Sequence, residues 1–363
     1  MKIAFYGSSL VSAYWNGAAT YYRGLLKALA ERGYDITFYE PNVFDRQKNR
    51  DIEPPDWCRV VVYEGTIPAL KQAASLSADA DIVCKASGVG FEDDLLLTEV
   101  LTHARQDALK IFWDVDAPAT LQDIRMSPDH PLRRALGEID LVLTYGGGEP
   151  VIQAYRAVGA KDCIPVYNAL DPETHHPVPS EPRFAASLGF LGNRLPDREE
   201  RVEAFFLDPA SRLQNETFLL GGSGWEGKAM SPNIRYIGHV STRDHNAFNA
   251  TPKAVLNISR ASMAQTGFSP ATRVFEAAGA AACIITDYWD GIDLFFTPGE
   301  EILVARDGQD VADILTALTP EKAAAVGQRA LAKVLDKHTY QDRAAAVDEL
   351  FRRRFADSRE AAE

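Results

Sequence analysis

The chain has few of the features that mark a disulfide-rich or membrane protein. Its four cysteines are widely spread and mostly lie within apolar, strand-like runs: Cys58, Cys84, Cys163 and Cys283. This pattern predicts reduced core residues, because neither a disulfide framework nor a metal motif has such spacing. No apolar run approaches the ~18 residues that span a membrane, and the N-terminal run breaks too early for a signal peptide. We therefore expect a cytoplasmic protein without a transmembrane segment.

Positive charge is also scarce. Lysine and arginine total 38 against 51 aspartates and glutamates, which gives a formal net charge of −13 over 363 residues. General nucleic-acid binding depends on neutralising the phosphate backbone, so this balance argues against it. Any phosphate that the protein recognises should be met by a few placed arginines. The length suffices for two domains, and the 46% hydrophobic content is that of a globular protein.

The first half alternates apolar, strand-like runs with helical or loop segments. Residues 2–6 read as a strand, Gly7–Gly17 as a loop, and an amphipathic helix follows and ends near Gly33. The loop lacks the G-x-G-x-x-G spacing, so a tight dinucleotide turn is not expected. The alternation predicts a parallel sheet covered on both faces. Its further strands are expected at 36–40, 60–63, 81–85, 110–113, 141–144 and 164–167.

A proline-rich linker, residues 168–182, separates this half from a second set of alternating elements. Strands are expected there at 187–192, 217–220, 234–237, 254–258 and 283–286, and helices at 309–318, 321–335 and 340–355. The whole pattern predicts two α/β domains. Adjacent His175 and His176 in the linker have no partners at metal-site spacing, so no metal site is predicted there.

The stretch 267–293 is predicted to fold as loop, helix, strand and loop. Ser269 is a good N-cap, and Gly279 can supply a left-handed stop. Inside this otherwise apolar helix, the carboxylate of Glu276 needs a partner. Its two oxygens can accept from both hydroxyls of a ribose. Alternatively, it forms a surface ion pair with Arg273 one turn earlier.

Two strand ends in the first half carry polar groups at the edge where open α/β sheets bind ligands. Asp114 and Asp116 follow one strand, and either carboxylate can accept or orient a hydroxyl proton. Asp116 can instead cap the next helix. Tyr145–Gly148 follows another strand. Its glycines either let a ligand approach the backbone or merely form the turn.

Arginines gather after the first strand of the second half. Arg194, Arg198 and Arg201 crowd the end of this strand and the first turn of the next helix. Asp197 is predicted to cap that helix. Cations at a helix N-terminus interact unfavourably with the helix dipole. A bound diphosphate would offset this repulsion. Alternatively, the arginines pair with neighbouring glutamates. Arg260 also follows a strand end, which is a place suited to phosphate.

Four motifs of the second half resemble the C-terminal half of glycosyltransferases of the GT-B fold. They are Arg273-Val-Phe-Glu276-Ala-Ala-Gly279, Ile284-Ile-Thr-Asp287, Pro298-Gly-Glu-Glu301-Ile-Leu-Val304 and His338-Thr-Tyr340-x-x-Arg343. The branch they resemble most is the spore-maturation-protein-like one, which is related to the retaining family-four enzymes. The resemblance covers residues 189–343 well and the N-terminal half in outline.

The resemblance implies an α/β protein of two Rossmann-like, doubly wound domains that face each other across a cleft. Residues 1–170 would form the acceptor side and 171–340 the donor side, and 341–363 a C-terminal helix that packs back on the first domain. The implied activity is that of a glycosyltransferase with a nucleotide-sugar donor, of UDP or GDP, and an acceptor that is a glycan, lipid, protein or small molecule. No metal ion or other cofactor is expected, because arginines and helix N-termini can stabilise the leaving diphosphate.

The resemblance also assigns the candidate residues to the two sides. In the family, the glutamate before Ala-x-x-Gly binds the donor ribose, and this position is Glu276 here. The donor-binding candidates are Asn193, Arg194, Arg198, His239, Arg260, Ser269, Arg273 and Glu276. The cleft or acceptor candidates are Asn16, Gly17, Thr20, Tyr145, Gly146 and Gly147. Asp114 and Asp116 are the candidate bases if the reaction inverts configuration; if it retains configuration, the departing phosphate can take the acceptor's proton.

One position departs from the family. The family-four pattern has a second glutamate eight positions before the ribose-binding one, where this chain has Phe268. Retention is expected from the related enzymes, but this glutamate's contact with the sugar is missing. A nucleotide-sugar epimerase or hydrolase and a non-catalytic nucleotide-sugar-binding protein therefore remain alternatives.

Overall fold

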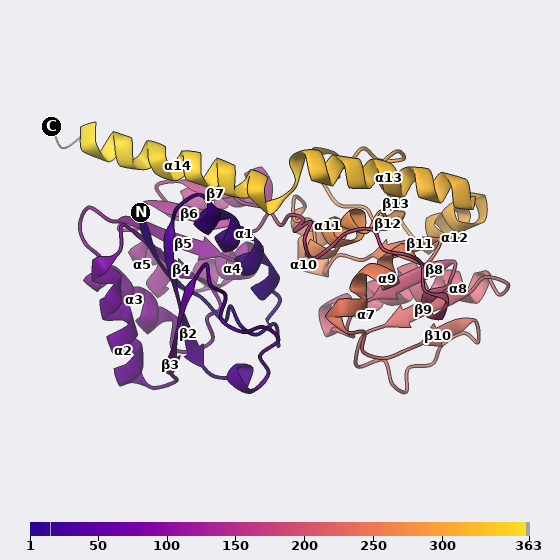
Figure 1. Ribbon diagram of the computed structural model, residues 1–363, viewed down its shortest axis with the longest axis horizontal. Helices are drawn as coiled ribbons and strands as arrows, with labels where there is room; N and C mark the ends of the chain where they lie inside the picture. Colours follow the sequence, from indigo (N-terminus) through magenta and orange to yellow (C-terminus); the bar gives the residue numbers. More distant parts are fainter. Residues whose placement is uncertain (15, 361–363) are drawn as a thin grey trace. The chain divides into compact units, whose positions relative to one another are not determined.

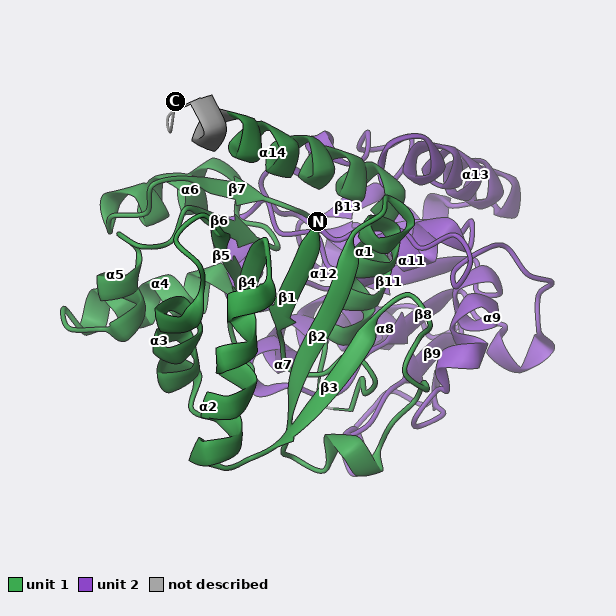
Figure 2. Cartoon of the chain, turned by 60° about the vertical axis from the view of Figure 1, so that its left-hand side comes forward, with its two compact units in different colours: residues 1–167, 340–363 green, residues 168–339 purple. Residues whose placement is uncertain are grey.

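The computed structural model describes residues 1–14 and 16–360 and divides the chain into two compact units. The first unit comprises Met1–Tyr167 together with Tyr340–Glu363, and the second comprises Asn168–Thr339. Figure 2 shows the two units in different colours. Each unit has one parallel sheet with helices around it, so the predicted α/β class is confirmed.

The first unit is built on a seven-stranded sheet in the order β3-β2-β1-β4-β5-β6-β7. Its strands are β1 (Lys2–Tyr6), β2 (Asp35–Asn42), β3 (Arg59–Glu64), β4 (Ile82–Ala86), β5 (Leu109–Asp114), β6 (Leu141–Thr144) and β7 (Cys163–Pro165). Its helices are α1 (Ala19–Glu31), α2 (Ile67–Ser75), α3 (Asp93–His103), α4 (Ala117–Met126), α5 (Pro131–Ala135), α6 (Gly148–Ala157) and α14 (Tyr340–Glu360). The central strands are buried nearly throughout, because helices cover both faces of the sheet.

The second unit has a six-stranded parallel sheet in the order β10-β9-β8-β11-β12-β13. Its strands are β8 (Leu188–Leu191), β9 (Phe218–Gly221), β10 (Ile234–Tyr236), β11 (Ala254–Asn257), β12 (Ile284–Asp287) and β13 (Leu303–Ala305). Its helices are α7 (Pro196–Val202), α8 (Asp208–Arg212), α9 (His245–Ala250), α10 (Ala261–Thr266), α11 (Thr272–Gly279), α12 (Gly308–Ala317) and α13 (Pro320–Lys337). The strand order reverses between β8 and β11. In open α/β sheets, ligands bind at the carboxyl ends of the strands beside such a reversal.

The C-terminal helix α14 belongs to the first unit, where it packs against α1. A Cβ on Gly24 of α1 would lie 2.1 Å from Cδ2 of Tyr340, so only glycine admits this ring. The Tyr34 hydroxyl donates to Asp348 of α14 at 2.7 Å and adds a polar contact. These contacts make α14 part of the first unit. No helix in the described part of the chain has the length and apolarity that crossing a membrane requires.

The sequence misplaced the start of α11. The helix begins at Thr272, after Ala271 as its N-cap, and the hydroxyl of Ser269 donates to the carbonyl of Gly267 instead of capping. Gly279 is the last helical residue, and the left-handed residue is Ala281, with φ 58°. The capping signals of the sequence therefore lie in the loop before the helix.

Two further capping predictions also differ from the structure. Helix α7 begins at Pro196 with Leu195 as its N-cap, and Asp197 instead accepts from Arg260. Asp116 does occupy the N-cap position of α4, but its side chain caps no described backbone N–H. The sequence thus predicted where these helices lie more accurately than which side chains cap them.

Candidate functional site

The carboxyl ends of β11 and β12 are tied together by a buried carboxylate. Asp287, the last residue of β12, is fully buried and accepts from the backbone N–H and the hydroxyl of Ser259 after β11. Arg201 also donates to it, at 2.5 Å. Burial raises the pKa of Asp287, while Arg201 opposes this shift. The predicted alternative for Arg201, a surface ion pair with a neighbouring glutamate, is wrong. Its partner is Asp287 at the end of β12.

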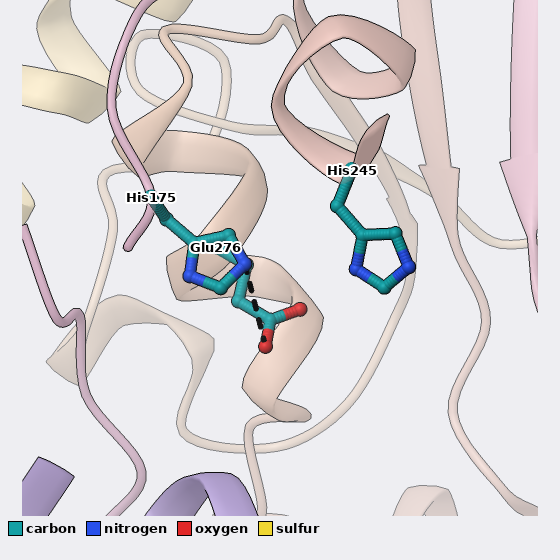
Figure 3. Close-up of side chains that lie close together, drawn as sticks. All are labelled: His175, His245 and Glu276. Carbon is teal, nitrogen blue, oxygen red and sulfur yellow. Dashed lines mark ion pairs between the residues drawn. The ribbon is translucent and has the colours of Figure 1, made fainter. Parts of the chain in front are cut away.

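Glu276 lies on α11 with two histidines beside its carboxylate (Figure 3). Its side chain is 18% exposed, and its Oε1 lies 3.9 Å from Nε2 of the buried His175. His245, the first residue of α9, completes the group. Burial lowers the pKa of His245; Glu276 opposes this shift, and Arg273 and His175 add to it. The sequence identified Glu276 but missed both histidines as its neighbours, because they come from segments far apart in the chain.

Arg273, one turn before Glu276, is a half-buried cation without a direct partner. It makes no hydrogen bond or ion pair with any described residue, so the predicted alternative of an Arg273–Glu276 ion pair is not formed. Burial lowers the pKa of Arg273, and the charge of Glu276 opposes this shift. A guanidinium in this state has five N–H donors available to a ligand.

Arg198 on α7 is the second cation of this region. Burial first, and then the charge of Arg273, lower the pKa of Arg198 to about 10. Its Nη2 donates to the Asn193 carbonyl at 2.7 Å, but its buried Nε has no partner in the described structure. The guanidinium lies over the Phe190 ring and beside Gly192, where a Cβ would approach it to 2.8 Å. The site therefore holds neighbouring positive charges with few groups to neutralise them.

Two other predicted phosphate contacts are already paired. Arg194 forms a bidentate pair with Glu199, at 2.8 Å from Nε and 2.6 Å from Nη2, as the alternative for this residue predicted. Arg260 donates to Asp197 at 2.5 Å. Either arginine would have to exchange a carboxylate for a phosphate in order to bind a donor.

The remaining donor-side candidates have different surroundings. Asn193 accepts through Oδ1 from the backbone N–H of Ser223, which fixes the loop after β8. His239 is exposed and makes no hydrogen bond or ion pair within the described ranges. Ser269 is held within its own loop. The backbone of Phe268 is left-handed, with φ 49°, and its ring packs where a Cβ on Gly291 would lie at 2.2 Å. Phe268 thus fills space in this loop.

In the first unit, the structure separates the two candidate bases. Asp114 is fully buried and accepts from Ser87 at 2.8 Å, from Thr120 at 2.9 Å and from the hydroxyl of Tyr155. Burial raises the pKa of Asp114, and these hydrogen bonds oppose the shift. This environment favours a structural role for Asp114 in holding the loop after β5. Asp116 is half-buried, and its role as a base stays a prediction.

The acceptor-side candidates of the loop before α1 also divide into two groups. Asn16 is buried, accepts from the Ser8 hydroxyl, and donates to the carbonyls of Ser9 and Ser12. Its hydrogen-bonding capacity thus serves the loop. Gly17 is exposed with open space around it, and Thr20 is half-buried at the start of α1. These two positions remain accessible candidates.

The glycines after β6 fit the interpretation as a turn. Gly147 has φ 91° and is the N-cap of α6, and a Cβ there would lie 2.0 Å from Cγ2 of Val151. Gly146 is buried beside it and accepts through its carbonyl from Thr144. The Tyr145 ring lies 3.9 Å from that of Tyr21, centroid to centroid. Packing and backbone geometry account for these residues without a ligand.

Comparisons with known proteins give a sequence match for part of the chain and structural matches for nearly all of it. Residues 198–349 match a protein-family model described as glycosyl transferase-like. No curated protein matches the chain by sequence.

Solved structures match nearly the whole chain. HepE of Anabaena, in complex with UDP-glucose, has a TM-score of 0.67 at 13% identity over 97% of this chain and 99% of its own. Sucrose-phosphate synthase of Thermosynechococcus elongatus has a TM-score of 0.66 at 15% identity over 98% and 100%. Phage T4 BGT, in complex with its UDP-glucose substrate, has a TM-score of 0.60 at 12% identity over 96% and 99%.

At these identities the structural likeness establishes the fold, and the family model adds the likeness in sequence of the second unit. The resemblance to GT-B glycosyltransferases that the sequence predicted is confirmed. The assignment to a single branch stays a prediction. Residues 198–349 thus match a glycosyl transferase-like family model, and the chain as a whole has the GT-B fold of its structural relatives.

Proposed function

We propose that the protein is a glycosyltransferase that takes its sugar from a nucleoside diphosphate sugar bound to the second unit. The observation that carries this proposal is the pair of neighbouring cations Arg198 and Arg273, of which Arg273 lies one turn before Glu276. Burial and mutual repulsion lower the pKa of Arg198 to about 10, so the pair is costly in the free protein. A doubly charged diphosphate would neutralise it, and charge-assisted hydrogen bonds to phosphate are strong.

Each group in this region has a role in donor binding. The two oxygens of Glu276 accept from the ribose hydroxyls, while Arg273 and Arg198 donate to the diphosphate. Arg194 and Arg260 join them if a phosphate displaces Glu199 and Asp197 from their ion pairs. The Arg260–Asp197 pair is exposed, and because exposed ion pairs contribute little to stability, its exchange costs little.

The chemistry follows from the charge that develops on the leaving group. As the glycosidic bond breaks, the diphosphate gains negative charge, and hydrogen bonds from the arginines strengthen in the transition state. The chain's own cations can supply this stabilisation, so we propose a metal-independent reaction. In a retaining reaction, the acceptor oxygen bonds to the anomeric carbon and its proton passes to the departing phosphate. In an inverting reaction, Asp116 is the candidate to take that proton.

Two of the structural relatives support UDP-sugars as the first donors to test, since HepE and T4 BGT were both solved with UDP-glucose. The departure at Phe268 removes a glutamate that contacts the sugar in the related family, and this bears on how the sugar is held. The proposal names no single acceptor: it can be a glycan, a lipid, a protein or a small molecule.

A thermal-shift screen tests the proposal. The purified protein is heated with UDP, GDP, ADP, CDP or TDP, each with and without Mg²⁺ or Mn²⁺. A ligand that binds only the folded state raises the apparent stability, by about 2.7 kcal/mol at a hundred times its Kd. We expect a shift with one diphosphate in the absence of metal. No shift with any of them at millimolar concentration would contradict the proposed donor site.

The same preparation then separates the candidate activities. A glycosyltransferase releases the nucleoside diphosphate from its sugar donor faster when an acceptor is added. An epimerase changes the sugar without an acceptor, and a binding protein leaves the donor intact.

A further inference from the structure

His175, His245 and Glu276 come together from three separate segments of the second unit (Figure 3). Their ligand atoms all lie within 4.8 Å of one another. Bonds of about 2.0–2.1 Å to a tetrahedral Zn²⁺ would bring such atoms to about 3.4 Å from one another. His175 Nε2 and Glu276 Oε1 are 3.9 Å apart. Side-chain rotations alone would therefore close the three groups on one ion.

A neighbouring hydroxyl holds the imidazole ring of His175. The Nδ1 of His175 lies 3.0 Å from the Thr174 hydroxyl, which leaves Nε2 as the atom that faces Glu276. Histidines that bind metals generally have their second ring nitrogen held by a protein group, which fixes the tautomer and the orientation of the ring. His175 shows this arrangement.

The backbone supports the same geometry. Gly279, one turn after Glu276, has the His175 carbonyl oxygen 2.9 Å from the place where its Cβ would be. The side-chain amide of Asn246, next to His245, donates to the Thr174 carbonyl at 3.0 Å. The segment that carries His175 is thus anchored to both α9 and α11, and the three ligands come from fixed positions.

We propose that His175, His245 and Glu276 form a site for one divalent transition-metal ion, best matched to Zn²⁺, and that this ion and a nucleotide ribose exclude each other at Glu276. Two imidazoles and one carboxylate are a ligand set that Zn²⁺ accepts, with a fourth position left for water. Mg²⁺ prefers oxygen ligands and would not compete for this site. The metal-binding part stands on the geometry alone, whereas the mutual exclusion rests on the proposed donor site.

The charge of Arg273 has opposite effects on the binding of the metal ion and of the diphosphate. Its positive charge acts on both Glu276 and His245. It favours a diphosphate and disfavours a metal dication. Replacing it by glutamine should therefore strengthen metal binding and weaken diphosphate binding, whereas general damage to the site would weaken both.

Metal binding is tested first, without nucleotide. Tag-free protein is stripped with EDTA and dialysed against Zn²⁺, and the bound metal is counted by mass spectrometry; Co²⁺ is used in parallel because its visible absorption reports tetrahedral coordination. We expect about one ion per chain. His245→Ala and Glu276→Gln should each lower the affinity at least ~10-fold, since even outer-shell changes have effects of this size. The matched control is His176→Ala, which alters the exposed neighbour of a ligand.

Unchanged metal binding in folded His245→Ala and Glu276→Gln proteins would overturn the site, as would a wild-type chain that binds no Zn²⁺ or Co²⁺. Far-ultraviolet circular dichroism checks that each variant is folded. Competition is measured next, as the loss of UDP affinity in the presence of Zn²⁺ but not of Mg²⁺. If metal binds and UDP affinity is unchanged by Zn²⁺, the exclusion is wrong and the site stands; if UDP does not bind even without metal, the proposed donor site fails instead.

Discussion

The carbonyl oxygen of His175 lies 2.9 Å from the position that a Cβ would occupy on Gly279. The same position is 2.4 Å from Cδ1 of Leu170. Gly279 is therefore needed for a close approach between the linker segment and α11, and not for the left-handed turn that the sequence suggested. The contact brings the segment that carries His175 against α11, the helix that carries Glu276.

Replacing Gly279 by alanine tests this relationship. Alanine has the higher helix propensity, by up to about 1 kcal/mol, but here its methyl group would meet backbone. We expect a net destabilisation of about 1–3 kcal/mol, the usual cost of overpacking, and a weaker affinity for UDP. Urea unfolding and calorimetry measure the two effects. Gly137→Ala is the control, because open space surrounds that residue; a Gly279 variant as stable as this control would remove the contact from the argument.

Glu276→Gln should weaken nucleotide binding while preserving the fold. Glutamine keeps the size of the side chain but has one acceptor oxygen in place of two and no charge, so ribose binding should lose about 1–3 kcal/mol, the scale of a charged hydrogen bond. Calorimetry with UDP and with uridine should show similar losses, since both carry the ribose. An unchanged affinity in a folded variant would exclude Glu276 from the site.

Arg198→Gln should weaken UDP binding without lowering the stability of the fold. Burial and nearby cations lower the pKa of Arg198 to about 10, so its charge is held at a cost in the free protein. The variant should be as stable as the wild type or more stable, yet bind UDP at least ~10-fold more weakly, the equivalent of about 1.4 kcal/mol. Uridine affinity should change little.

The paired Arg194 provides the comparison for Arg198. Its bidentate bond to Glu199 predicts a smaller loss of UDP affinity in Arg194→Gln. If each variant loses as much affinity for uridine as for UDP, both arginines are structural.

The contrast between Glu276 and His245 shows what the sequence can predict here. Apolar runs placed the strands of both sheets, because a strand buried on both faces leaves a local signature. Glu276 was identifiable because a carboxylate stood in a short apolar helix. His245 had no such signal, since its relation to Glu276 exists only after α9 and α11 have packed.

The difference in burial between Asp114 and Asp116 likewise could not be predicted from the sequence. Asp114 and Asp116 look equivalent in the sequence, two positions apart after an apolar strand. In the structure one is enclosed by Ser87, Thr120 and Tyr155 and the other is half-buried. The partner of Arg201 could not be predicted either, because Asp287 lies far along the chain and meets it only at the sheet edge.

The buried Asp114 leads to a prediction about pH. Burial raises the pKa of its carboxyl group in the folded state above the ordinary value. Between these two pKa values, the folded chain holds more protons on this group than the unfolded chain does. By linkage, the group's contribution to stability is therefore fully present below the unfolded pKa and is lost as pH rises through the folded pKa.

Asp114→Asn removes this titration while an amide oxygen still accepts from Ser87 and Thr120. The free energy of unfolding of the variant, relative to the wild type, should increase as pH rises from the ordinary aspartate pKa through the raised one. Urea unfolding at a series of pH values measures this difference, with Asp129→Asn, at an exposed position, as the control for a lost surface charge. A difference that stays flat, or that falls with rising pH, would mean that Asp114 is held as a stable anion by its hydrogen bonds, and a base role for it would then have to be considered again.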